Sequence, residues 1–142
     1  MKISKVYTLV VLMLVMVSSC GKDDPSTPDE RDLAFEKLSG SWTLGSTGEV
    51  IVDGQDVSLN YSGFSLSFTD GAYTTINAGE LFNASGNWSW ANEQAGEITL
   101  NGNRSIRLMS LSDSQFTFSF TFSGNGGVRA GVSGGYEITV VK

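Results

Sequence analysis

The sequence predicts an all-β protein: an antiparallel up-and-down β-barrel of about eight to ten strands, preceded by one short helix. Two observations support this fold class. From residue 40 to the end, apolar and polar residues alternate with a period of two, as in half-buried strands. Short turns join the strands with no helical segment between them, so neighbouring strands should run antiparallel. Such a sheet buries its apolar face by closing into a barrel or by folding over as a sandwich.

Residues 1–19 are expected to be a lipoprotein signal peptide. Two lysines precede an apolar run at 6–17, which is shorter than the roughly 20 residues of a membrane-spanning helix. Residues 17–21 (VSSCG) then resemble the lipobox of bacterial lipoproteins. The resemblance implies cleavage before Cys20, a diacylglycerol on its sulfur and acylation of the new amine, and such multiple chains anchor a protein stably. The alternative is a free thiol after an ordinary signal peptide.

Residues 20–32 are expected to form a flexible tether, because they contain both prolines and no large apolar side chain. Within this stretch, Lys22, Asp23 and Asp24 resemble the export signal that carries some lipoproteins to the outer face of the outer membrane. We therefore expect a lipid-anchored protein of the outer membrane, exposed at the cell surface. The periplasmic face is the alternative location, and a solvated linker is the alternative interpretation of the charges.

A barrel domain is expected over residues 33–142, starting with a helix at 31–38 that ends near Ser39-Gly40. Asp53-Gly54, Asp70-Gly71 and Asn101-Gly102 are typical hairpin turns. The expected strand segments are 50–52, 57–61, 64–68, 72–76, 86–91, 98–100, 106–108, 115–123 and 136–140.

The helix end runs into Gly40-x-Trp42 on the first strand, and this arrangement resembles the lipocalin-like domains of small bacterial surface lipoproteins. The resemblance covers residues 33–142. It implies an eight-stranded barrel that holds one apolar ligand, with the Trp42 indole closing the narrow end. In that family an Arg of the last strand packs over this Trp. The late basic residues of this chain are Arg129 and Lys142, and the second motif of the family has no clear match.

Two groups of aromatic residues are candidate ligand contacts. Trp88 and Trp90 lie two residues apart in a polar segment, hence on one face of a strand. They are either core residues or, if exposed, a surface on which sugar rings stack. A second group forms a stripe on one expected strand, which either fills the barrel or lines a pocket. The stripe consists of Phe116, Phe118, Phe120 and Phe122.

The composition excludes several kinds of chemistry. The chain has no His and one Cys, so it has no Ser-His-Asp triad, no Cys-His pair and no His-ligated zinc. Loss of the signal peptide removes two lysines and no acid, which lowers the net charge from −6 to −8. An acidic protein of this kind is an unsuitable partner for nucleic acid. We expect no cofactor and no metal, and the sequence does not indicate an oligomeric state.

Three functions follow from these patterns. The first is a non-enzymatic, lipid-anchored barrel that binds a small apolar or amphiphilic molecule. The second is a surface module that binds a glycan or a protein and has a packed barrel without an internal ligand. The third is an enzyme that uses carboxylates alone, which requires two facing acids in a cleft with raised pKa values. The absence of distinctive catalytic groups favours a non-enzyme.

Overall fold

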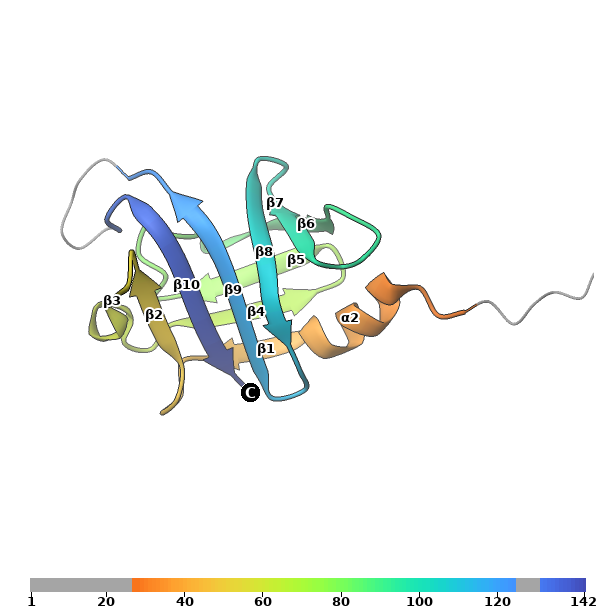
Figure 1. Ribbon diagram of the computed structural model, residues 1–142, viewed down its shortest axis with the longest axis horizontal. Helices are drawn as coiled ribbons and strands as arrows, with labels where there is room; N and C mark the ends of the chain where they lie inside the picture. Colours follow the sequence, from red (N-terminus) through yellow and green to blue (C-terminus); the bar gives the residue numbers. More distant parts are fainter. Residues whose placement is uncertain (1–26, 125–130) are drawn as a thin grey trace, which may run out of the picture.

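Ten strands and two short helices build the described part of this computed structural model, residues 27–124 and 131–142 (Figure 1). The helices are the α-helix α2 (Glu30–Leu38) and the 3-10 helix η1 (Ser58–Tyr61). The strands are β1 (Gly40–Thr43), β2 (Glu49–Val52), β3 (Gln55–Asp56), β4 (Ser65–Thr69), β5 (Ala72–Ile76), β6 (Ser85–Trp90), β7 (Glu97–Leu100), β8 (Arg104–Leu111), β9 (Gln115–Phe122) and β10 (Gly134–Val141). The expected signal peptide, Cys20, Lys22, Asp23 and Asp24 lie outside the described residues.

Eight of the strands close into a barrel, as the alternation predicted. They follow one another in the order β1, β4, β5, β6, β7, β8, β9 and β10, and β10 pairs with β1 at Val141 and Thr43. All of these pairs are antiparallel. β2 and β3 continue the sheet outward from β10. Of the two expected architectures, the chain therefore adopts the barrel and not the sandwich.

β1 and β2 lie one after the other along the same edge of β10, and a short loop separates them. Thr43 pairs with Val141, and β2 then begins opposite Thr139. The loop fits because Gly48 has no side chain: a Cβ there would lie 2.3 Å from the carbonyl oxygen of Leu44 and 2.6 Å from that of Thr139. After this tight loop, β2 lies outside the eight-stranded barrel, and its other edge pairs with β3.

The prediction of a strand over residues 57–61 is wrong. A two-residue strand, β3, ends at Asp56, and the chain then forms η1. The Asp56 carboxylate accepts hydrogen bonds from the backbone N–H of Ser58, at 2.9 Å, and from its hydroxyl, which favours a turn over a continued strand. Leu59 is 94% exposed while Tyr61 is buried, so the alternating apolar residues here do not share one face of a strand.

The hairpin turns form where the sequence predicted them. Asp53-Gly54 joins β2 to β3, Asp70-Gly71 joins β4 to β5, and Asn101-Gly102 lies between β7 and β8. Asn101 has φ +51° and Gly102 has φ +73°, the two positive values that a type I′ turn requires. These tight links produce the up-and-down order of the sheet.

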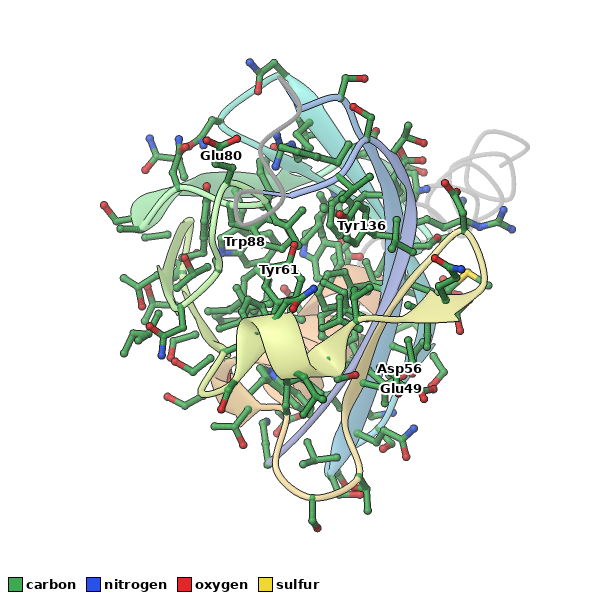
Figure 2. The ribbon with its side chains drawn as sticks, turned by 90° about the vertical axis from the view of Figure 1, so that its left-hand side faces the viewer. Glu49, Asp56, Tyr61, Glu80, Trp88 and Tyr136 are labelled. Carbon is green, nitrogen blue, oxygen red and sulfur yellow. The ribbon has the colours of Figure 1, made fainter. Side chains whose placement is uncertain are left out.

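The barrel has a closed end, where α2 packs, and an open end, where η1 and the loop of residues 77–84 lie (Figures 1 and 2). Side chains that point inward from the strands form one hydrophobic core between the two ends. The largest fully buried members are Trp42, Phe64, Phe116, Phe118, Leu38, Leu81, Ile98, Ile106, Ile138, Val50 and Val140.

Candidate functional site

Trp42 closes the barrel at the end covered by α2. Its indole is fully buried and donates a hydrogen bond of 2.8 Å from Nε1 to the carbonyl oxygen of Leu38, the last residue of the helix. The Nζ of Lys142 lies 4.4 Å from the centre of the Trp42 ring and donates to the carbonyl oxygens of Lys37 and Ser39. One indole and one ammonium thus join α2, β1 and the end of β10.

The basic side chain over Trp42 is a lysine that follows the last strand, where the family pattern has an Arg on that strand, and the sequence alone did not assign the position to Lys142. The other late basic residue, Arg129, lies outside the described residues. Lys142 follows β10, so its position over the indole depends on the register of the closing pair between β1 and β10.

The phenylalanine stripe of β9 points into the barrel. The ring centres of Phe116 and Phe118 are 4.8 Å apart, and those of Phe118 and Phe120 are 6.2 Å apart. Phe120 stacks in turn on Tyr136 of β10, at 5.3 Å. All these side chains are buried. The stripe therefore forms a continuous stack of rings along the barrel interior.

The loop of residues 77–84 inserts two large apolar side chains into the open end, and we call Leu81 and Phe82 the plug. Leu81 is fully buried and Phe82 is 6% exposed. The Phe82 ring centre lies 4.9 Å from that of Phe120 and 6.2 Å from that of Phe118. Sequence reasoning missed the plug, although two adjacent large apolar residues in a loop were a usable signal.

Arg104 covers the plug from β8. Its guanidinium lies 5.8 Å from the ring centre of Phe82 and 5.4 Å from that of Phe122, and it donates a hydrogen bond to the carbonyl oxygen of Leu81. Arg104 lies two residues before the buried Ile106 on β8, so its side chain is on the same, inward face of the strand, at the mouth of the barrel. The sequence analysis did not single it out.

Two tyrosines complete the open end, as Figure 2 shows. The Tyr136 hydroxyl donates to the carbonyl oxygen of Val132, at 2.7 Å. Burial, together with a side-chain hydrogen bond to Tyr136, raises the pKa of Tyr61 far above its usual value. A recess of about 20 Å³ lies beside these rings, and a second one, of about 40 Å³, lies beside Tyr73 and Arg104. Each is large enough for a water molecule but not for an apolar ligand.

Trp88 and Trp90 lie on one face of β6, as predicted, and their rings meet edge to face at 5.1 Å. Trp88 is buried and donates from Nε1 to the carbonyl oxygen of Thr69, at 2.8 Å. Its ring also contacts Phe35 of α2 and Phe68 of β4. Trp90 is half-buried. Trp88 therefore belongs to the core at the closed end, and the half-buried Trp90 packs against that core.

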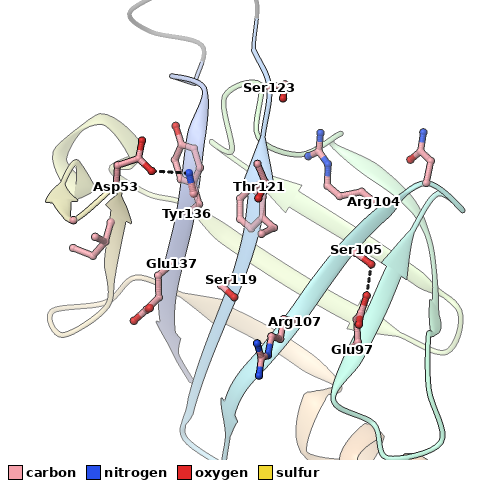
Figure 3. Close-up of a pocket in the computed structure, with 15 residues that line it drawn as sticks. Asp53, Glu97, Arg104, Ser105, Arg107, Ser119, Thr121, Ser123, Tyr136 and Glu137 are labelled. Carbon is pink, nitrogen blue, oxygen red and sulfur yellow. Dashed lines mark hydrogen bonds between the residues drawn. The ribbon is translucent and has the colours of Figure 1, made fainter.

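An open groove lies outside the barrel, across β2, β7, β8, β9 and β10 (Figure 3). We call it the outer groove, and its volume is about 900 Å³. Polar side chains from these strands and their turns line most of it. They are Asp53, Glu97, Asn103, Arg104, Ser105, Arg107, Ser119, Thr121, Ser123 and Glu137. The sequence analysis did not predict this site, because its residues come from five strands.

Two carboxylates of the outer groove are held by hydrogen bonds. Asp53 accepts from the backbone N–H of Gly135, at 2.9 Å, and Glu97 accepts from the Ser105 hydroxyl. Within residues 27–124 and 131–142, no group of three His, Cys, Asp or Glu side chains lies close enough to hold a metal ion.

No protein-family model matches this chain, and no curated protein has a significantly similar sequence. Among the described residues, no helix combines the length and apolar character needed to cross a membrane.

Proposed function

We propose that this protein is a lipoprotein of the bacterial envelope, anchored by lipid on Cys20, whose filled barrel is a rigid, non-enzymatic module that binds a partner through its outer surface. The lipobox-like residues 17–21 support the anchor, and Lys22, Asp23 and Asp24 support export to the cell surface. The β-barrel domain is present in the structure, with ring stacking throughout its interior.

The plug is the observation that carries this proposal. Leu81 and Phe82 occupy the open end of the barrel, where an internal ligand would enter, and they contact the ring stack of β9. A close-packed interior of this kind leaves no room for a guest molecule. The space available to a partner lies outside, in the outer groove.

The position of α2 fits an anchor at the closed end. The chain from Cys20 to Glu30 reaches at most about 35 Å when fully extended. It enters the domain at α2, which covers the closed end of the barrel (Figure 1). Under this proposal, the membrane lies on the side of α2, and the outer groove on the flank of the barrel is accessible to partners.

An apolar ligand inside the barrel is the competing function, which the lipocalin resemblance implied. Such a ligand would have to displace the plug and break the bond between Arg104 and the carbonyl oxygen of Leu81. It would then take the place of the Phe82 ring against Phe118 and Phe120.

Metabolic labelling with a clickable palmitate analogue tests the anchor. We expect the wild-type chain and the neighbouring control Ser18→Ala to take up label, and Cys20→Ala to take up none. Label on Cys20→Ala would contradict the proposal.

Protease treatment of intact cells tests the location. We expect the wild-type protein to be digested, and a variant with Lys22, Asp23 and Asp24 all replaced by Ala to be protected. A wild-type protein that resists digestion until the outer membrane is opened would place it on the periplasmic face.

A further inference from the structure

The strand register aligns charged and small polar side chains across the outer groove. Glu97 of β7 pairs with Arg107 of β8, Arg107 with Ser119 of β9, and Ser119 with Glu137 of β10. All four residues line the groove. Arg107 and Glu137 are two strand spacings apart, about 10 Å. Across the four strands, these side chains are in order a carboxylate, a guanidinium, a hydroxyl and a carboxylate (Figure 3).

The floor of the outer groove consists of small residues. Thr121 of β9 pairs with Gly135 of β10, which has no side chain, and Ser105 and Ser119 also line the groove. A ligand can therefore approach the sheet closely and meet hydroxyl groups there. The aromatic residues at its edge, Phe120 and Tyr136, are buried in the barrel and offer no exposed apolar surface.

The walls of the outer groove carry charged groups of both signs. Asp53 and Glu97 are held by the bonds described above, and Glu137 is exposed. Arg107 is exposed and forms no ion pair with the described residues. The lining residues present three carboxylates and the guanidinium of Arg107, while the guanidinium of Arg104 is bound to the carbonyl oxygen of Leu81 at the mouth of the barrel. A polyanion would meet the carboxylates, and an apolar partner would leave these polar groups without water or hydrogen bonds.

We propose that the outer groove binds a neutral glycan. Sugar hydroxyls both donate and accept hydrogen bonds, so they match a surface on which carboxylates, hydroxyls and a guanidinium alternate. Arg107 donates to sugar oxygens, Glu97 and Glu137 accept from sugar hydroxyls, and Ser119 lies beneath the ring. The volume of about 900 Å³ is within the range of small-ligand sites. This assignment rests on the proposed function, which makes the outer surface the binding surface.

Binding to a panel of immobilised neutral, acidic and amino oligosaccharides tests the assignment, using the full chain with Cys20→Ala to keep it free of lipid. We expect binding to neutral oligosaccharides. Arg107→Ala and Glu137→Gln should each weaken it about tenfold, because each removes hydrogen bonds to a charged group. Ser119→Tyr should abolish binding, because the new side chain fills the floor.

Glu49→Gln is the matched control. Glu49 is an exposed acid on β2, close to Glu137 in the sheet but outside the lining of the outer groove. We expect its affinity for neutral oligosaccharides to equal that of the parent chain. Circular dichroism of each variant would show that the barrel is folded.

Three results would overturn the assignment: no binding to any neutral oligosaccharide, binding to acidic oligosaccharides alone, or equal affinities of the parent chain and folded Ser119→Tyr. These results are separate from those that test the proposed function. Loss of palmitate labelling in the wild-type chain contradicts the anchor, and a ligand inside the barrel contradicts the filled interior. Neither experiment depends on glycan binding.

Discussion

At the scale of single residues, Arg104 and Phe82 explain how side chains fill the open end of the barrel. Phe82 fills the space against Phe118 and Phe120, and the Arg104 guanidinium lies over the Phe82 ring. The charge stays at the mouth of the barrel, where it is half-buried and bonded to the carbonyl oxygen of Leu81. This arrangement avoids the cost of placing an unpartnered charge in an apolar interior.

Replacing Phe82 by Ala should lower the free energy of unfolding by about 3 kcal/mol, because it removes a buried ring and leaves a cavity. Chemical denaturation measures this loss. Leu59→Ala is the control: Leu59 is 94% exposed on η1, so its loss should cost less than about 0.5 kcal/mol. Equal costs for the two variants would contradict the plug.

Lys142→Met should lower the free energy of unfolding by about 1 kcal/mol, because it removes the ammonium from the Trp42 ring and from two carbonyl oxygens. The matched control is Lys37→Met on the exposed side of α2, with an expected change below about 0.5 kcal/mol. Both values come from chemical denaturation followed by Trp fluorescence. A Lys142→Met variant as stable as the control would show that the contact over Trp42 contributes nothing.

At the scale of secondary-structure elements, most strands follow from the sequence because one face of each is buried. The alternating residues of 115–123 and 136–140 predicted β9 and β10, and the turn pairs predicted the hairpins. The alternating apolar residues at 57–61 led to a wrong prediction of a strand. The Asp56 carboxylate accepts a hydrogen bond from the backbone N–H of Ser58, and a turn begins there.

The candidate sites were predicted less completely than the strands. Trp42 and the phenylalanine stripe were identified from local patterns. The plug and the outer groove depend on contacts between segments far apart in the chain, such as Leu81 with Arg104 and Asp53 with Gly135. No local pattern determines these contacts.

The loop between β1 and β2 should be more sensitive to substitution than an ordinary turn. Gly48→Ala places a Cβ against two carbonyl oxygens, and we expect a loss of about 2–3 kcal/mol in the free energy of unfolding. Gly54→Ala is the control. Its Cβ would meet nothing within 4 Å, although its φ is +83°, so it should cost about 1 kcal/mol of backbone strain. If Gly54→Ala proves the more damaging of the two, the tight loop is not what separates β1 from β2.

The N-terminus of α2 should respond to acid. Asp29 caps the helix, and its hydrogen bonds with Arg31 lower its pKa from 3.8 to about 2. Because this pKa is lower in the folded state, the charged carboxylate stabilises the helix above about pH 4. That stabilisation is lost as the pH falls toward 2.

Nuclear magnetic resonance of the α2 amides during an acid titration measures this loss. Asp29→Asn keeps a capping side chain but removes the charge, so its α2 amides should show no such transition. Asp32→Asn, a first-turn acid that does not cap the helix, should behave as the parent chain does. A transition of the same size in Asp29→Asn would assign the pH dependence to another group.

At the scale of the whole molecule, the barrel is closed and filled with side chains, and the surface that we propose as the binding surface lies outside it. Eight strands form the closed barrel, and aromatic side chains fill it. β2 and β3 extend the sheet, and β2 with the turn that follows it forms one wall of the outer groove. The lipid anchor proposed at Cys20 would hold this body at the membrane by its closed end.

The central claim is that the barrel is filled by its own side chains. Native mass spectrometry of the full chain with Cys20→Ala, purified without detergent from a bacterial host, tests it most directly. We predict the mass of the bare protein under all gentle conditions. A reproducible extra mass that disappears on extraction with organic solvent would contradict the claim, because it would reveal a ligand where the structure places Leu81 and Phe82.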